Sequence, residues 1–555
     1  MKKIPSLLAL ALSVIAFSSL PATATVKLNG LFCDHMVLQT GIAVPVWGSA
    51  DPHEKITVEF AGQSKQAEAD DAGRWSVKLD SLPVNATPGV LTVQGTNTLT
   101  VSDVLVGEVW LASGQSNMGF PLSAAANADD EIPQAKDDQL RFFNVPHKTA
   151  AEPQTELPEG KWEVTTPDTA KTFSAVAYFF AKEIRAKKGC PVGVITGSWG
   201  GTPIQIWISL EGIKKAPPLT KTLDQWNKAE ELYAQYKANP QLGTDYDTAL
   251  KDWQANVQPA FDAATKQYND DKAAGKAVGD KPKPSQPEPV NPNPMGMTSP
   301  SKRPHTPTVA FNAMIAPLIP YALRGAIWYQ GEENGGAGME YRDLLPRLIE
   351  DWRSHWGYDF PFLFVQLPCN GPDPKPVATG GWPWLREAQF MTLRVPQTGM
   401  AITIDIGDPS NVHPKDKVDV GQRLALVARK VVYGETLVAS GPLYKDFTVS
   451  GNQINVRFTE IGGGLTPGQA PWRPTGVDPL PTDKLIGFFI AGDDQQWFPA
   501  DATIQGDTVS VSSPQVAKPV AVRYGWANSP RCNLYNKEGL PASPFRTDDW
   551  SNPKP

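Results

Sequence analysis

The stretch EVWLASGQSNM, residues 108–118, is an apolar run that ends in small residues, hydroxyls and amides. The apolar part predicts a buried strand, and residues 114–117 predict the turn that follows it. Ser116 is then either a polar turn residue or a nucleophile exposed at the edge of a sheet. A serine hydroxyl is a poor nucleophile at neutral pH, so the second interpretation requires a base and oxyanion donors elsewhere in the chain.

Strands and helices alternate along the segments that follow. Residues 173–189 have helical apolar spacing and end in basic residues and a glycine. Residues 190–201 have the pattern of a short buried strand that runs into a glycine turn. Residues 323–357 repeat the order of strand, loop and helix, and residues 360–367 and 399–408 add two apolar strands. This alternation predicts an α/β fold with a largely parallel sheet and with ligand loops at the carboxyl ends of its strands.

Two regions rich in predicted strands flank the α/β part. Both alternate apolar and polar residues between Gly, Asp, Asn and Pro turns, which predicts β-sandwich-like modules. The predicted division is a signal peptide at 1–24, an N-terminal β module at 25–104, a catalytic domain in two parts at 105–213 and 306–433, an insertion at 214–305, and a C-terminal β module at 434–555.

The insertion and the N-terminus have distinctive compositions. The insertion joins polar helical segments to the run KPKPSQPEPVNPNP, which cannot be helical and predicts an extended linker. The chain begins with lysines, an apolar run and then small residues, as a cleaved secretory signal does. No later stretch is apolar for the roughly 18 residues that a membrane span needs. We therefore expect a periplasmic or secreted protein without a membrane span.

Charge and cysteine usage exclude several classes of protein. The formal charge of -7 argues against a nucleic-acid groove, which requires clustered Lys and Arg. The four cysteines contain no CxxC pair, and in an oxidising compartment they allow one or two disulfides in three full pairings. These cysteines are Cys33, Cys190, Cys369 and Cys532. The six histidines lack the close spacing of metal ligands, so we expect no metal.

One histidine has the placement that a catalytic base requires. His413 follows the predicted strand AITIDIGD directly and precedes the predicted helix VDVGQRLALVARKVV. The carboxyl ends of parallel strands meet at one edge of a sheet, so His413 is expected at the same edge as Ser116. The other five histidines fit this placement less well.

Six motifs carry a resemblance to a known family. In chain order they are GQSNM, GSWGGTPIQIWIS, FNAMIAPLIP, GAIWYQGEEN, LREAQ and DIGDPSNVHPKDK. Together they resemble the sialate O-acetylesterase-like branch of the SGNH hydrolases, a group of carbohydrate esterases. DHMVLQ near the start and NLYNKEGLPASPFRTDDW near the end are also similar to that family. The resemblance therefore covers nearly the whole mature chain except the insertion.

The resemblance implies a fold and a set of site residues. The fold would be a flavodoxin-like α/β/α sandwich flanked by β modules, with Ser116 as nucleophile and His413 as general base. The oxyanion would be held by the amide of Ser116, by the amide of Gly200 or Gly201, and by a side-chain amide from YQGEEN. Gln330 and Asn334 are the two candidates for that side chain, and the sequence does not choose between them. No cofactor is implied.

The chain departs from the family pattern at the third triad position. Many SGNH enzymes have an aspartate three residues before the histidine, where this chain has Ser410. Asp408 or Asp405 could orient the imidazole, or a backbone carbonyl could do so and leave a dyad. Asp408 is our preferred candidate. Absence of an orienting carboxylate would lower the rate without abolishing it.

The resemblance further implies an O-acetylated oligosaccharide or polysaccharide as substrate. Aromatic faces stack on sugar rings, and Trp382 and Trp384 lie in a Gly- and Pro-rich stretch that favours an exposed pair. Arg386 and Glu332 are further candidates for contact with the sugar. The acidic charge balance and these tryptophans favour a neutral plant hemicellulose, xyloglucan or xylan, over sialic acid, which would need a cationic partner.

The sequence also has features of a carbohydrate-binding protein, a glycosidase and other serine hydrolases. A non-catalytic carbohydrate-binding or adhesion protein would suit two β modules and 17 tryptophans, but it has no reason to keep Ser116, His413, the Gly200–Gly201 turn and the QGEEN amides together. A glycosidase pair of Glu332 and Glu333 is disfavoured because adjacent residues on an extended loop point apart. A lipase or peptidase is disfavoured because the chain has no GxSxG motif around Ser116.

Overall fold

The structure is a computed structural model. It describes residues 26–157, 160–215, 217–274, 276–297, 302–371, 381–472 and 477–550. The predicted signal peptide lies outside the described residues. Within the described ranges, no helix is both long and apolar enough to cross a membrane. Cys33, Cys190, Cys369 and Cys532 are free thiols, so none of the disulfide pairings that we allowed is formed.

One long strand organises the molecule. β8 (Thr98–Gly114) begins among the N-terminal strands and ends at the turn that contains Ser116. Residue 104, where the sequence predicted a boundary between two modules, lies inside this strand, because the apolar alternation continues into the fully buried run that follows. The N-terminal module and the central sheet are therefore joined by a shared strand.

Around β8 the central sheet is largely parallel. Its strands are β9 (Asp137–Asn144), β10 (Trp162–Thr165), β11 (Val192–Ser198), β12 (Gly325–Tyr329), β13 (Phe362–Val365) and β14 (Thr398–Ala401). Their order is β10-β9-β11-β8-β12-β13-β14; among these seven described strands the edge pair β10 and β9 is antiparallel and the other pairs are parallel. Because β8 has later strands on both sides, its carboxyl end is a topological switch point, where open α/β sheets bind ligands. The sequence analysis did not predict β9 and β10.

Helices cover both faces of this sheet. In β8, Trp110 and Ser113 point to opposite faces, because they lie three positions apart in a strand. Trp110 packs against Phe180 of α3 (Ala175–Lys188) with ring centroids 4.8 Å apart. Trp328, which pairs with Ser113, packs against Trp352 of α8 (Gly338–Trp356) at 5.9 Å.

Two further helices lie beside these. α10 (Val418–Val431) packs against α3, and α9 (Trp382–Met391) packs against α8. The predicted helix over 173–189 is α3, which begins after the N-cap Ser174 and ends at Gly189 in the left-handed conformation.

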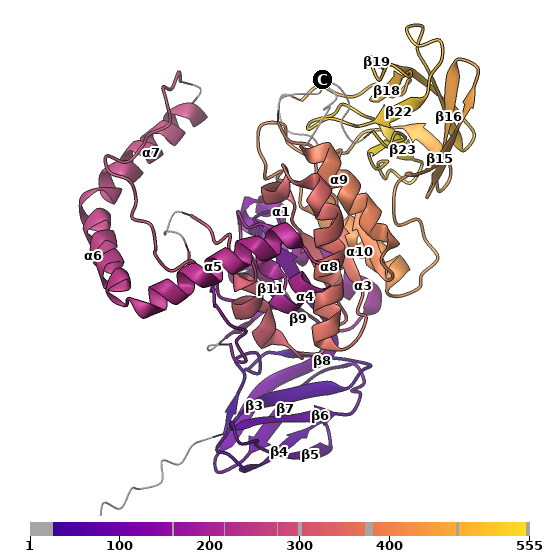
Figure 1. The fold of residues 1–555 in the computed structure, drawn as a ribbon. Coiled ribbons are helices and arrows are strands. Elements are labelled where there is room, and N and C mark those ends of the chain that lie inside the picture. Colours follow the sequence, from indigo (N-terminus) through magenta and orange to yellow (C-terminus); the bar gives the residue numbers. More distant parts are fainter. Residues whose placement is uncertain are drawn as a thin grey trace, which may run out of the picture.

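The N-terminal strands form the lower end of the molecule in Figure 1. They are β1 (Lys27–Leu28), β2 (Val37–Gln39), β3 (Val44–Ser49), β4 (Lys55–Phe60), β5 (Gln63–Glu68), β6 (Arg74–Leu79) and β7 (Asn85–Gln94). β1, β3 and β6 form one sheet, and the others continue the sheet of β8. Strict alternation of buried and exposed residues in β6 accounts for its one-sided packing.

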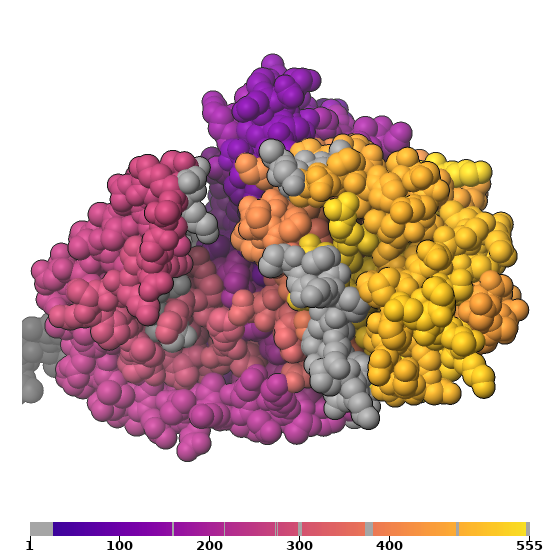
Figure 2. Space-filling view, turned by 90° about the horizontal axis from the view of Figure 1, so that it is seen from above, coloured from indigo at the N-terminus to yellow at the C-terminus, as the bar shows by residue number. Residues whose placement is uncertain are grey.

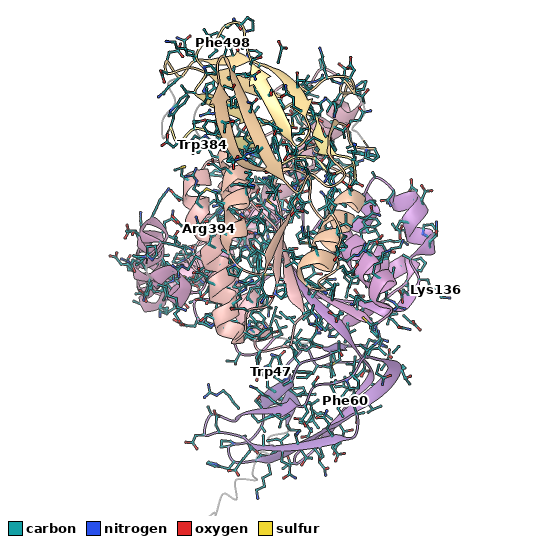
Figure 3. The ribbon with its side chains drawn as sticks, turned by 90° about the vertical axis from the view of Figure 1, so that its right-hand side faces the viewer. Trp47, Phe60, Lys136, Trp384, Arg394 and Phe498 are labelled. Carbon is teal, nitrogen blue, oxygen red and sulfur yellow. The ribbon has the colours of Figure 1, made fainter. Side chains whose placement is uncertain are left out.

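The C-terminal strands form a separate β region at the opposite end. They are β15 (Leu443–Ser450), β16 (Gln453–Thr459), β17 (Leu465–Pro467), β18 (Phe488–Ala491), β19 (Trp497–Pro499), β20 (Asp501–Gln505), β21 (Thr508–Ser512), β22 (Ala521–Tyr524), β23 (Leu534–Asn536) and β24 (Phe545–Arg546). Two four-stranded sheets and one pair of strands result. Figure 3 shows Phe498 in the C-terminal region and Trp47 and Phe60 in the N-terminal module on the other side of the core, with Trp384 between the core and the C-terminal region.

The insertion leaves the α/β core as an arm of helices. α4 (Leu210–Lys214) leads into α5 (Thr220–Ala238), α6 (Gln241–Asn256) and α7 (Gln258–Ala273), which extend away from the sheet in Figure 1. The proline run at 281–294 contains no helix or strand, as its composition predicted. Seen from above in Figure 2, the arm and the C-terminal region stand on either side of a hollow.

Candidate active site

The turn that carries Ser116 depends on a glycine. Gly114 ends β8 with a φ of 132°, and a Cβ built on it would lie 2.2 Å from the carbonyl oxygen of Tyr329. Only glycine therefore lets β8 approach β12 this closely before the chain turns. Gly119 closes the turn by donating its amide to the carbonyl of Gln115 at 3.0 Å. Ser116 is held between these two points, beside the carboxyl end of β8.

His413 lies directly beside Ser116. Its Nε2 is 2.7 Å from the Ser116 Oγ, although 297 residues separate the two along the chain. The loop that holds it runs between β14 and α10, and Asn411 Oδ1 accepts the amide of His413 at 2.9 Å. Burial, and then the positive charge of Lys417, lower the pKa of His413 below its ordinary 6.5. The imidazole is therefore unprotonated at neutral pH and can accept the proton of Ser116.

Two backbone amides, those of Ser116 and of the neighbouring Gly200, belong to residues that adjoin the Ser116 side chain. Among the described residues, neither the amide of Ser116 nor that of Gly200 donates a hydrogen bond to another group. A Cβ built on Gly200 would lie 3.1 Å from the Ser116 Cβ, so a side chain at this position would crowd the serine. Gly201 follows with a φ of 68° and turns the chain away. This arrangement can stabilise an oxyanion formed next to Ser116.

The side-chain amides expected to join these donors are bonded elsewhere. Gln330 donates its Nε2 to the carbonyl of Thr202 and to Asn334 Oδ1 at 3.2 and 2.8 Å. Asn334 donates its Nδ2 to Gln205 Oε1 at 3.0 Å. Both side chains are buried, with exposed fractions of 0 and 3 %. They brace the loop after β12, and the structure does not present either of them to the pocket.

The two candidate acids also have other partners. Asp408 Oδ1 accepts the amide and the hydroxyl of Ser410 at 2.8 and 2.7 Å. Asp405 forms a two-pronged ion pair with Arg423 at 2.6 and 2.8 Å and accepts the hydroxyl of Tyr535 at 3.0 Å. No hydrogen bond joins either carboxylate to His413 in the described part of the chain. Ser410, which occupies the usual position of the acid, instead donates hydrogen bonds to Asp408.

Ser116 and His413 open into a cavity of about 630 Å³. Its wall contains hydroxyls, a side-chain amide, two imidazoles and apolar side chains, and none of the described lining residues is Asp, Glu, Lys or Arg. The lining is Ser116, Gly119, Phe120, Pro121, Asn144, Val145, Pro146, His147, Thr172, Ser174, Thr196, Ser198, Gly200 and His413. Within the described residues, no group of three His, Cys, Asp or Glu is placed to hold a metal ion.

The chain is similar to a solved carbohydrate acetylesterase over almost its full length. The crystal structure of that enzyme, from Xanthomonas citri, shares 36 % sequence identity and superposes with a TM-score of 0.74, covering 95 % of this chain and all of the other. The chain belongs to the sialate O-acetylesterase-like family of carbohydrate acetylesterases. It is therefore a carboxylic ester hydrolase.

Curated relatives of this acetylesterase agree over the same length. The sialate O-acetylesterase of Mus musculus is 29 % identical, with 96 % of each chain covered. The human sialate O-acetylesterase is 28 % identical over 97 % of this chain and 95 % of its own. No family model matches the chain.

The four side chains that we expected to contact the sugar, those of Trp382, Trp384, Arg386 and Glu332, do not line the pocket of this acetylesterase. Trp384 is 3 % exposed, because it packs between the ring of Trp526 and the guanidinium of Arg546 in the C-terminal region. The prediction of an exposed pair is therefore wrong for Trp384, and Trp382 is half-buried beside it. Figure 3 shows Trp384 where α9 meets the C-terminal strands.

Arg386 is fully buried and bonded to backbone. Its guanidinium donates to four carbonyl oxygens, those of Leu367, Pro368, Ala527 and Asn528, at 2.6 to 2.9 Å. These carbonyls come from the loop after β13 and from the C-terminal region. The expectation that Arg386 contacts substrate is wrong, since its donors tie two parts of the fold together.

Two residues that the sequence analysis did not single out adjoin the site. Asn117 donates its Nδ2 to Glu332 Oε1 at 2.6 Å and to the carbonyl of Val412 at 2.9 Å. Lys417 donates its Nζ to Asn117 Oδ1 at 2.6 Å. Glu332, proposed from the sequence as a sugar contact, thus faces this buried network and not the pocket. The only signal in the sequence was proximity, because Asn117 follows Ser116 and Lys417 closes the motif HPKDK.

Proposed function

We propose that this enzyme removes acetyl groups from O-acetylated carbohydrates with Ser116 as nucleophile and His413 as general base. The observation that carries this proposal is the 2.7 Å contact between Ser116 Oγ and His413 Nε2 at the mouth of a cavity. Among the described residues the amides of Ser116 and Gly200 donate no hydrogen bond, which supports the assignment of the oxyanion hole to these two amides. An adhesion protein would have no use for this arrangement.

The proposed reaction has two steps. Ser116 Oγ attacks the acetyl carbonyl while His413 takes its proton, and the oxyanion forms next to the amides of Ser116 and Gly200. Collapse breaks the ester bond, and the imidazolium gives its proton to the departing sugar oxygen. Water, deprotonated by His413, then attacks the acetyl-serine and releases acetate. His413 returns the proton to Ser116 Oγ, and the reaction as written uses no cofactor.

The catalytic pair is proposed to work without a carboxylate hydrogen-bonded to His413. The carboxylates of Asp405 and Asp408 are engaged with Arg423 and Ser410, which supports a dyad. The parallel order of β11, β8, β12, β13 and β14, second-first-third-fourth-fifth along the chain, supports a flavodoxin-like SGNH core. Export to the periplasm or outside the cell stays a proposal from the first 24 residues.

A neutral sugar is the proposed substrate class, with xyloglucan or xylan as the leading examples. The described wall of the cavity contains no Lys or Arg to pair with a sugar carboxylate, and its hydroxyls and the Asn144 amide suit neutral hydroxyl groups. Sialic acid is the second candidate, because the mammalian relatives are named sialate O-acetylesterases. The two differ in the charge that the cavity must accommodate.

A comparison of acetate release tests the function and the sugar class together. Wild-type enzyme is assayed at equal concentration on acetylated xylan, acetylated xyloglucan and O-acetylated sialic acid, with Ser116→Ala as the control. We expect release from the neutral polysaccharides, and a fall of at least about 10³-fold in the variant. Release from sialic acid alone would overturn the sugar class, and equal rates for variant and wild type would overturn the function.

A further inference from the structure

Lys417 occupies a position that is unfavourable for a cation. It is the N-cap of α10, where the helix dipole disfavours positive charge, and its exposed fraction is 0 %. Burial lowers its pKa to about 7, although Glu332 and Asp416 oppose that shift. A lysine in such a place needs a partner that compensates for the lost hydration.

The partner is Asn117, next in the chain to Ser116. Lys417 Nζ donates to Asn117 Oδ1 at 2.6 Å, and the ammonium also lies over the rings of Phe120 and Tyr329 at 4.8 and 5.5 Å. Phe120 in turn stacks against His413, with centroids 6.4 Å apart. The cation and the imidazole therefore pack against the same ring.

Lys417 fixes the orientation of the Asn117 amide. An ammonium can only donate, so the Asn117 oxygen must face Lys417 and its nitrogen must face away. That nitrogen donates to the carbonyl of Val412, which belongs to the peptide bond that leads into His413, and to Glu332 Oε1. A flipped amide would place an acceptor against two acceptors, at the cost of both hydrogen bonds.

We propose that Lys417 is a positioning residue for this site: through Asn117 it ties the loop of His413 to the turn of Ser116, and it places a positive charge behind the imidazole. It takes the role that a carboxylate on the imidazole holds in a full triad, by bracing the backbone of the base instead of its ring. This inference rests on the proposed roles of Ser116 and His413.

The charge has a predictable direction of effect. The groups that face Lys417 are Glu332 and Asp416, and the charged group that acts on His413 is Lys417 itself. Burial and this cation both lower the pKa of His413. Replacement of Lys417 by a neutral side chain removes one of these two causes. The pKa of His413 then rises, and the base becomes active only at a higher pH.

Two variants separate the tie from the charge. Lys417→Met removes both, so we expect kcat to fall by about 10²-fold through misplacement of the base and the acid limb of kcat/KM to move to higher pH. Asn117→Ala removes the tie and leaves the lysine in place, so we expect kcat to fall as well but the acid limb to move less than in Lys417→Met. Lys430→Met, at the other end of α10 and paired with Glu460, is the matched control and changes neither.

The closing measurement does not depend on esterase activity. Histidines labelled with ¹³C at Cε1 are titrated by NMR in Ser116→Ala protein with and without Lys417→Met, and the His413 signal is assigned by its loss in His413→Gln. We expect the pKa of His413 to rise when Lys417 is absent. An unchanged pKa, or wild-type kcat and acid limb in Lys417→Met, would overturn the inference even if the enzyme is an esterase. If Lys417→Met does not fold, a wild-type kcat in Asn117→Ala overturns it.

Discussion

The hydroxyl of Ser116 and the imidazole Nε2 of His413 lie 2.7 Å apart at the carboxyl edge of the central sheet. Ser116 reaches this edge from β8, and His413 reaches it from the loop after β14, which lies three strands from β8 in the sheet order. Neither Asp405 nor Asp408 extends this pair into a hydrogen-bonded triad. His413 is therefore held through its backbone, and its surroundings favour the unprotonated imidazole.

Activity should persist into mildly acidic solution. The base works in its unprotonated form, and burial together with Lys417 lowers the pKa of His413 below 6.5. Therefore kcat/KM should fall as the pH drops through a value below 6.5, and at pH 6.5 it should exceed half of its plateau. A pH profile with a chromogenic acetyl ester measures this. An acid midpoint above 6.5 would show that another environment, or another base, governs the reaction.

Gly200→Ala should damage catalysis more than stability. The added Cβ would lie 3.1 Å from the Ser116 Cβ, closer than an ordinary contact, so Ser116 and the backbone of residue 200 have to shift apart by a few tenths of an ångström. We expect kcat to fall by about 10²-fold to 10³-fold with little change in KM, as for loss of one oxyanion donor. Gly336→Ala is the control, because a Cβ there meets no atom within 4 Å. Equal kinetics for the two variants would remove Gly200 from the oxyanion hole.

The two candidate acids should respond differently to removal of charge. Asp408→Asn should lower kcat by less than about 10-fold, far below the roughly 10⁴-fold loss that follows removal of the charge of a triad aspartate. Asp405→Asn removes the charge that pairs with buried Arg423 at 2.6 Å and leaves this guanidinium the longer ion pair with Asp419 at 3.4 Å, so it should lower the free energy of unfolding by up to about 3–5 kcal/mol. Kinetics and urea unfolding of both variants check this. A large kinetic loss in folded Asp408→Asn would restore the triad.

Arg386→Met should destabilise the fold without a specific effect on KM. The substitution leaves the carbonyls of Leu367, Pro368, Ala527 and Asn528 without the donor that now bonds all four. The carbonyl of Asn528 keeps the amide of Asn370 at 3.1 Å, but each buried group left unsatisfied costs about 1–3 kcal/mol, so a clear fall in melting temperature is expected. Thermal unfolding and KM on an acetylated oligosaccharide are compared with wild type. A raised KM at an unchanged melting temperature would return Arg386 to the substrate site.

Local sequence patterns predicted much of the framework of this protein. The apolar run at 108–113 forms the buried end of β8, and the basic residues and Gly189 mark the end of α3. The placement of His413 after a strand was also readable, since parallel strands end at one edge. β9 and β10 were missed because their apolar runs are short and interrupted by polar residues. The two strands pair with each other at the edge of the sheet.

The sequence could not identify which donors, acids and aromatic side chains face the cavity. Asn334 Oδ1 accepts the amide of Ile204, 130 residues away, so its role depends on how two loops pack. Trp384 is covered by Trp526 and Arg546, which belong to a distant part of the chain. Lys417 reads as one more basic residue in HPKDK, and only packing against Asn117 and Phe120 makes it unusual.

Covalent labelling tests the central claim most directly. A chromogenic phosphonate ester transfers its phosphonyl group to an activated serine and releases its leaving group, and peptide mass spectrometry locates the adduct. The account predicts one adduct, on Ser116, in parallel with loss of acetate release, and much slower labelling in His413→Ala. An enzyme that keeps releasing acetate while Ser116 stays unlabelled, or that carries the adduct on another residue, would contradict it.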